Sequence, residues 1–144
     1  MTIKQLSIFV ENKPGTMYAM TRVLAEHGVD MRALSLAETK DFGIVRIIAN
    51  NVYQATTVLK DAGYVHSLTP VLCVAIPDEP GGLNRVLEVL SDGGANVEYM
   101  YAFLGGKDTE HAYMIFRVED AGKADAILAA KGIKTVGQEE LERL

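Results

Sequence analysis

The feature that most constrains this chain is an internal repeat centred on a Pro-Gly dipeptide. A strand-like run leads into Asn12-Lys13-Pro14-Gly15, a helix-like pattern follows, and the same order returns at Asp78-Glu79-Pro80-Gly81. The offset is 80 − 14 = 66 residues, and at that offset Asp30 falls on Asn96. We therefore interpret the chain as a tandem duplication, with one domain over residues 1–70 and a second over residues 71–144.

The offset changes once within the repeat. Asn51 falls on Asp120 and Gly63 on Gly132, which is an offset of 69 residues. The difference, 69 − 66 = 3 residues, indicates an insertion in the turn around Gly105-Gly106-Lys107-Asp108. A turn between two strands is a place where a surface loop tolerates added residues.

Each half carries the same order of predicted elements. In the first half, Gly28 and Gly63 are expected to stop the helices and Asn51 to cap the second helix. Pro70 marks a short linker. The hydrophobic periodicity predicts strand, helix, strand, strand, helix and strand over 3–10, 16–27, 31–38, 44–49, 52–62 and 64–68, then over 71–76, 82–91, 97–104, 112–118, 121–131 and 133–136.

This order predicts an α+β protein of two ferredoxin-like βαββαβ units, each an antiparallel sheet with both helices on one face. The other face would be left bare. The run Val71 to Ile76 is apolar without alternation, and Tyr99, Tyr101 and Phe103 share one side of their strand. Strands that are apolar on both sides need cover on both sides. We therefore expect a close pair of domains within a homodimer.

Composition argues against several kinds of binding partner and cellular location. The net charge is −5 and no cluster of Lys and Arg is present, so we expect no binding to nucleic acid or to an anionic membrane. No signal peptide or membrane-spanning run is evident, which predicts a cytoplasmic protein. The single cysteine, Cys73, lies inside an apolar strand and is expected to pack in the core.

The sequence shows no catalytic or metal-binding pattern. His27, His66 and His111 lie in different predicted elements, and no Cys or carboxylate stands at the spacing of metal ligands. No nucleophile elbow, paired-carboxylate motif or phosphate-binding loop is present. We therefore expect no metal, no cofactor and no enzyme activity.

The repeated loop is the candidate site, because its residue types suit a free amino acid. Gly15 and Gly81 lack a Cβ, so a carboxylate can approach the N–H groups at the start of a helix. Asn12 and Asp78 beside the loops, with Asp30 and Asn96 before the next strands, offer oxygen acceptors for an ammonium group. Gly82 is expected to make the second loop the more open. Ordinary turn and capping chemistry is the alternative interpretation.

At these residues the chain resembles the ACT domain, a regulatory module that binds amino acids. Asn12-Lys13-Pro14-Gly15 followed by Gly28-Val29-Asp30-Met31 carries the resemblance in the first unit, and the equivalent segments carry it in the second, over residues 3 to 136. The resemblance implies a paired-domain regulator that binds an amino acid between ACT units. The implied ligand-binding residues are Asn12, Lys13, Pro14, Gly15, Thr16, Met17, Asp30, Met31, Asp78, Glu79, Pro80, Gly81, Gly82, Leu83, Asn96 and Val97.

Three functions remain open from the sequence. The favoured one is an amino-acid sensor that changes domain or subunit packing and passes this change to a partner protein, such as a metabolic enzyme. The second is an interaction subunit of an enzyme that has lost ligand binding. The third is a small enzyme on a ferredoxin-like scaffold, which fold alone does not exclude.

Overall fold

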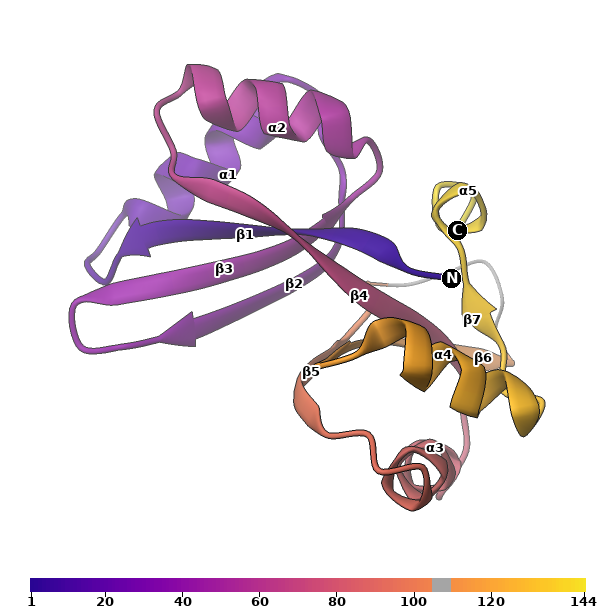
Figure 1. The fold of residues 1–144 in the computed structure, drawn as a ribbon. Helices are drawn as coiled ribbons and strands as arrows, with labels where there is room; N and C mark the ends of the chain where they lie inside the picture. Colours follow the sequence, from indigo (N-terminus) through magenta and orange to yellow (C-terminus); the bar gives the residue numbers. More distant parts are fainter. Residues whose placement is uncertain (105–109) are drawn as a thin grey trace. The chain divides into compact units, whose positions relative to one another are not determined.

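The structure is a computed structural model that describes residues 1–104 and 110–144. The predicted insertion at Gly105-Gly106-Lys107-Asp108 lies outside the described residues. Figure 1 shows the elements in chain order. They are β1 (Ile3–Glu11), α1 (Thr16–Glu26), β2 (Met31–Glu38), β3 (Phe42–Ala49), α2 (Val52–Asp61), β4 (His66–Pro77), α3 (Gly82–Asp92), β5 (Val97–Ala102), β6 (His111–Val118), α4 (Ala121–Ala130), β7 (Thr135–Val136) and α5 (Gln138–Leu141).

The chain forms two compact units. The first unit is Lys4–Thr69, and the second is Pro70–Leu144 together with Met1–Ile3. The domain bounds 1–70 and 71–144 stay a prediction. They are drawn from the sequence repeat, whereas these two units are defined by how compactly the chain folds. The two units are described separately below.

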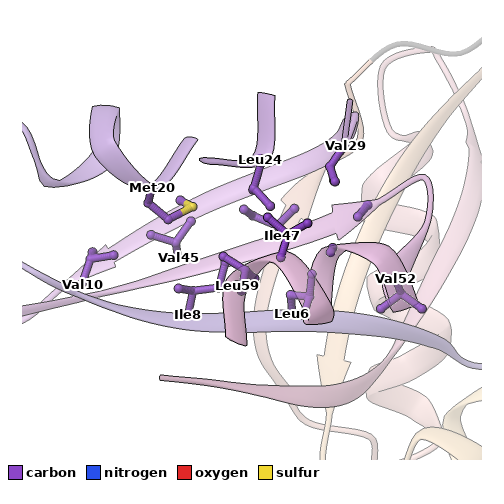
Figure 2. Close-up of a cluster of buried hydrophobic side chains, with 13 residues drawn as sticks. Leu6, Ile8, Val10, Met20, Leu24, Val29, Val45, Ile47, Val52 and Leu59 are labelled. Atoms are coloured by element: carbon purple, nitrogen blue, oxygen red, sulfur yellow. The ribbon is translucent and has the colours of Figure 1, made fainter. Parts of the chain in front are cut away.

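In the first unit the strands lie in the order β2-β3-β1-β4, and both β1 and β2 pair with β3 in antiparallel register. Both helices cover one face of this sheet (Figure 1). Alternate residues of β1 and β3 point at the helices, and Figure 2 shows the resulting cluster. Its buried side chains are Leu6, Ile8, Val10, Met20, Leu24, Val29, Val45, Ile47, Ala49, Val52, Ala55, Val58 and Leu59.

In the second unit the strands lie in the order β7-β4-β6-β5, and β4 pairs with β6 and β7 in antiparallel register. Side chains from β4, α3, β6 and α4 form its core. They are Leu72, Val74, Ile76, Val86, Leu90, Phe116, Val118, Ala124 and Leu128. The predicted α+β class, with two βαββαβ ferredoxin-like units, is confirmed.

The predicted helix boundaries agree closely with the structure. The side chain of Asn51 accepts a hydrogen bond from the N–H of Gln54 at 3.1 Å, and Asp120 accepts from Lys123 at 3.0 Å. Both therefore act as N-caps. Gly28 and Gly63 follow the ends of α1 and α2 with positive φ angles of 69° and 83°.

The prediction of a linker at Pro70 is wrong. The expected strands over 64–68 and 71–76 form one continuous strand, β4 (His66–Pro77), which runs through Pro70. The fixed φ of proline suits extended backbone, and its missing N–H is tolerated where a strand is not fully paired. Pro70 is exposed, and its carbonyl accepts a hydrogen bond from Arg117 Nη1 at 2.8 Å. The sequence pattern is interrupted at Pro70, but the backbone stays extended there and the strand continues.

Smaller differences concern strand ends, and one of them is that β5 ends at Ala102, two residues before the expected end. β3 begins at Phe42, two residues before the expected start at Ile44, and β7 is only Thr135–Val136. Within the described residues, no helix has the length and hydrophobicity needed to cross a membrane.

Candidate functional site

The first Pro-Gly loop joins the end of β1 to the start of α1. Gly15 is the N-cap residue of α1 and has φ 86° and ψ −11°, in the left-handed region. A Cβ built on Gly15 would meet no heavy atom within 4 Å. The loop is held by Thr16, whose hydroxyl donates to the carbonyl of Glu11 at 2.7 Å and to that of Lys13 at 3.0 Å. The backbone conformation at position 15 therefore favours glycine, and the space beside it is open.

The second loop repeats this backbone. Gly81 has φ 84° and ψ −5°, and again a Cβ there would meet no heavy atom within 4 Å. The N–H of Asn12 donates to the carbonyl of Asp41 at 3.0 Å, and the N–H of Asp78 donates to that of Glu110 at 3.1 Å. The two loops thus make equivalent hydrogen bonds to the hairpins of their own units.

Gly82 does not make the second loop more open, contrary to the expectation from sequence. Gly82 is buried, and a Cβ on it would stand 2.2 Å from the carbonyl oxygen of Pro77. In the first loop the equivalent position is Thr16, which reaches the equivalent carbonyl, that of Glu11, through its hydroxyl. Because Gly82 has no side chain, its backbone packs directly against the end of the preceding strand.

Neither loop supplies a side-chain cap to its helix. Gly15 and Gly81 are the N-cap residues, no side chain caps α1 or α3, and neither helix has an acidic residue in its first turn. In contrast, α2 and α4 are capped by Asn51 and Asp120. The first N–H groups of a helix have no partner within the helix, and the helix dipole makes this end attractive to anions. The N–H groups of Thr16 and Gly82, the first residues of α1 and α3, already donate to the carbonyls of Lys13 and Glu79. The donors left for a ligand are therefore the second and third N–H groups of each helix.

The side chain of Asn12 is partly committed to its own unit. Its Nδ2 lies 3.2 Å from the carbonyl oxygen of Thr39 and 3.4 Å from Glu38 Oε2. These hydrogen bonds fasten the loop to the turn between β2 and β3. Among the described residues no donor reaches its Oδ1, which remains an acceptor for a ligand ammonium.

Asp30 does not lie beside the Pro-Gly loop of its own unit. It precedes β2, whose far end at Glu38 is the end that Asn12 contacts. Eight residues of extended strand separate the two ends by roughly 25 Å. The carboxylate of Asp30 forms an ion pair with Arg32 at 3.1 Å, and its N–H donates to Asn50 Oδ1 at 3.0 Å. A single amino acid cannot contact both Asp30 and Gly15 within one unit.

The same separation holds in the second unit. Asn96 precedes β5, and Val97 pairs with Val118 at the end of β6. The second Pro-Gly loop contacts Glu110, just before the opposite end of β6. Asn96 instead lines a pocket of about 290 Å³ with Asp120 and Lys123.

The remaining predicted residues divide into exposed and packed ones. Lys13, Pro14, Glu79 and Pro80 are exposed, and Lys13 pairs with Glu11 at 2.7 Å. Four apolar residues are partly buried against the two cores: Met17, Met31, Leu83 and Val97. A small pocket of about 100 Å³ lies at the first loop, and Asn12, Lys13, Thr16 and Met17 are among its lining residues.

Each Pro-Gly loop borders one pocket that has an equivalent in the other unit by repeat position. The pocket of the first unit, about 250 Å³, is lined by residues that include Phe9, Thr16, Ala19 and Tyr64. The pocket of the second unit, about 170 Å³, is lined by Ala75, Pro77, Gly82, Arg85, Val86, His111, Lys131, Gly132, Ile133 and Lys134. The pairs Phe9 and Ala75, Thr16 and Gly82, Ala19 and Arg85, and Tyr64 and Ile133 occupy matching positions.

Sequence reasoning did not single out Arg85, Lys131 or Lys134. They come from different elements, so no local motif joins them. The signal was present in the repeat itself, because aligning the halves at offsets of 66 and 69 places these cations opposite Ala19, Ala62 and Val65. Among the residues that the structure describes, no group of three or more His, Cys, Asp or Glu side chains is placed to hold a metal ion.

Comparison with known proteins agrees with this architecture. The family model described as an ACT domain pair matches residues 1–144. No curated protein matches the sequence significantly. A crystal structure of a protein from Bacteroides thetaiotaomicron is 36% identical, with a TM-score of 0.91 over 100% of this chain and 98% of that one.

Regulatory subunits of aspartate kinase share the fold at lower identity. The ligand-free subunit from Thermus thermophilus is 16% identical, with a TM-score of 0.65 over 88% of this chain and 91% of that one. The subunit from Thermus flavus is also 16% identical, with a TM-score of 0.60 over 88% and 90%. The full-length match to the family model, with the fold and the two Pro-Gly loops, shows that this chain belongs to the ACT domain family as an ACT domain pair.

Proposed function

We propose that this protein is a non-catalytic, cytoplasmic regulator that binds a free amino acid at its Pro-Gly loops and signals by changing domain or subunit packing. One observation carries the proposal. Both copies of the loop present a helix N-terminus with a left-handed glycine and no side-chain cap, while α2 and α4 are capped by their own side chains. Among helices α1 to α4, the N-termini without a side-chain cap are therefore those that follow the duplicated loops.

The carboxylate of the ligand would dock at the uncapped N-terminus. A carboxylate there accepts hydrogen bonds from backbone N–H groups and interacts favourably with the helix dipole. The open space beside Gly15 and Gly81 admits it, since a Cβ would meet nothing within 4 Å there. This assigns the loops the role of recognising the part common to all amino acids.

The ammonium group needs an acceptor near the loop. Asn12 supplies one through its Oδ1, and Asp78 supplies a carboxylate at the equivalent position. Asp30 and Asn96 lie too far along the strands to contact the ligand of their own unit's loop.

Such a ligand would bind at the strength of a metabolite sensor. About ten heavy atoms at roughly −0.5 kcal/mol per atom give about −5 kcal/mol, which corresponds to a sub-millimolar Kd. Binding changes packing only if the ligand has different affinities for two arrangements. We propose that the regulator works as a homodimer and that a metabolic enzyme receives the signal. Regulatory subunits of aspartate kinase share this fold, which supports a metabolic enzyme as the partner class.

A thermal-shift screen tests the proposal. The purified chain is heated with each free amino acid at about 1 mM. A ligand with a Kd of about 0.2 mM would stabilise the native state by about 1 kcal/mol, a rise in Tm of a few °C. A shift with one amino acid or one related group supports a sensor. The absence of any shift favours an interaction subunit that has lost ligand binding.

A further inference from the structure

We propose that the pocket beside the second Pro-Gly loop binds a small anion with two negative charges, a dicarboxylate or a phosphate. This site is separate from the amino-acid site proposed above and does not rest on it, since Gly82 is the only residue common to both. The observation is a convergence of cationic side chains around one cavity. The equivalent cavity of the first unit is lined by a single cation, Lys13, which pairs with Glu11 at 2.7 Å.

The cavity is lined by residues from different elements of the second unit. Arg85 comes from α3, His111 begins β6, Lys131 follows α4 and Lys134 precedes β7. No Asp or Glu is among the residues that line it. A chain with a net charge of −5 therefore gathers three permanent cations and a histidine around about 170 Å³. Such a site attracts anions through the summed field of its charges.

The repeat supplies an internal comparison for each cation. The N–H of Arg85 donates to Gly81 as that of Ala19 donates to Gly15, and His111 pairs with Pro77 as Phe42 pairs with Glu11. Lys131 and Ala62 both follow their helices as C-cap residues. The carbonyl of Lys134 accepts from Ala75 as that of Val65 accepts from Phe9.

At every one of these four positions the first unit has an apolar residue, Ala19, Phe42, Ala62 or Val65. The backbone is the same, so the fold does not demand cations there. At these four positions the second unit has Arg85, His111, Lys131 and Lys134, and all four line one cavity.

The cations keep a net positive charge after their own contacts are counted. Lys134 forms an ion pair with Glu140 at 2.5 Å. Neither Arg85 nor Lys131 makes an ion pair with any residue of the described ranges 1–104 and 110–144. Both side chains are exposed, so they can turn toward an anion without leaving a buried charge. Arg85 suits a carboxylate or phosphate best, because its planar guanidinium donates two parallel hydrogen bonds.

The size of the cavity limits the ligand. A volume of about 170 Å³ equals that of about six water molecules at roughly 30 Å³ each. This admits an ion the size of succinate or inorganic phosphate and excludes a nucleotide. Two negative charges match the two cations that lack ion pairs.

Nuclear magnetic resonance of the ¹⁵N-labelled full chain tests the proposal. Succinate, inorganic phosphate and neutral succinamide are titrated separately at constant ionic strength. We expect succinate or phosphate, but not succinamide, to shift the amide signals of Ala75, Gly82 and Ile133 with saturation. The equivalent signals of Phe9, Thr16 and Tyr64 should stay unchanged, which makes the first unit a control within the same molecule. Saturation by one of the two anions alone would identify which chemistry the site prefers.

Two substitutions give the cavity the residues of the first unit, Arg85→Ala and Lys131→Ala. Each should weaken binding at least threefold and the double variant at least tenfold, because a charge-assisted hydrogen bond is lost in each. Arg143→Ala removes an exposed cation outside the cavity and should leave affinity unchanged. No saturable shift with either anion, or unchanged affinity in the double variant, would overturn the proposal. Thermal melts confirm that each variant remains folded.

Discussion

The carbonyl oxygen of Pro77 occupies the space where a side chain of Gly82 would begin. A Cβ on Gly82 would stand 2.2 Å from that oxygen, and the nearby carbonyl carbon is 3.3 Å away. Real Cβ atoms do not approach backbone oxygen this closely, so the first turn of α3 packs on the end of β4 only because residue 82 is glycine. In the first unit, Thr16 holds the same junction with its hydroxyl.

Gly82→Ala should therefore destabilise the protein by about 2–4 kcal/mol, because the backbone of the loop must move to relieve the contact. Urea denaturation followed by circular dichroism measures the loss. Gly122→Ala is the matched control, since its Cβ would meet only Asp120 Oδ1 at 3.7 Å in helix α4. That variant should be neutral or stabilising by up to ~1 kcal/mol. Equal stability of the two variants would contradict the close contact at Gly82.

The capping residues of α2 and α4 should each contribute measurably to stability. Asn51→Ala and Asp120→Ala remove the acceptors of the Gln54 and Lys123 N–H groups. Each should lower the free energy of unfolding by about 1 kcal/mol. Asn84→Ala removes an exposed asparagine from within α3 and should cost nothing, because alanine is the better helix former. A loss in Asn84→Ala as large as in the two capping variants would argue against the caps.

Cys73 should be unreactive in the folded protein. Burial, assisted by the negative charge of Glu140, raises the pKa of its thiol to about 12 from the ordinary 9.0. At pH 8 only about one molecule in ten thousand would carry the thiolate, the reactive form. An aromatic disulfide reagent should label Cys73 quickly in urea and very slowly without it. Fast labelling of the native protein would contradict burial of Cys73 in β4.

The same shift predicts a pH dependence of stability. The thiol is protonated more strongly in the folded state than in the unfolded state, so its contribution is complete below pH 9. Above that pH the unfolded chain loses the proton first, and stability should fall as pH rises toward about 12. Cys73→Ser or Cys73→Ala should show a shallower decline in that range in urea titrations, and an identical decline would contradict this assignment.

Local chemistry made much of the fold predictable. Asn51, Gly28 and Gly63 gave correct helix boundaries because capping depends on neighbouring backbone alone. Pro70 gave a wrong strand boundary, because whether proline interrupts a strand depends on which strands lie beside it. The matched hydrogen bonds at Asn12 and Asp78 show that the repeat is as regular in structure as in sequence.

The arrangement of the candidate site was less predictable. Asp30 and Gly15 are close in sequence and share a motif, yet the helix between them carries the chain back to the other end of the sheet. Arg85 and Lys134 are far apart in sequence and line one cavity. The separation of the first pair and the proximity of the second both depend on the path of the chain through the fold. A local sequence pattern does not give that path.

The loop glycines should tolerate asparagine in the fold but not in ligand binding. Asn adopts the left-handed region at modest cost, of about 1–2 kcal/mol, and the space at Gly15 and Gly81 is open. Its side chain would fill the approach to the helix N-terminus. Gly63→Asn is the control, because Gly63 also has a positive φ, of 83°, and open surroundings but follows the C-terminal end of α2. Melting temperatures of the three variants should fall by similar amounts, and a much larger fall at Gly15 or Gly81 would contradict the open loop.

The central claim is that the Pro-Gly loops hold the carboxylate of a free amino acid. Isothermal titration calorimetry with the amino acids tests it most directly, comparing the wild type with the double variant Gly15→Asn/Gly81→Asn and with Gly63→Asn. We predict saturable heat with a sub-millimolar Kd for the wild type and for Gly63→Asn, and no binding to the double variant. Equal affinity in all three proteins, or no binding of any amino acid to the wild type, would contradict the account.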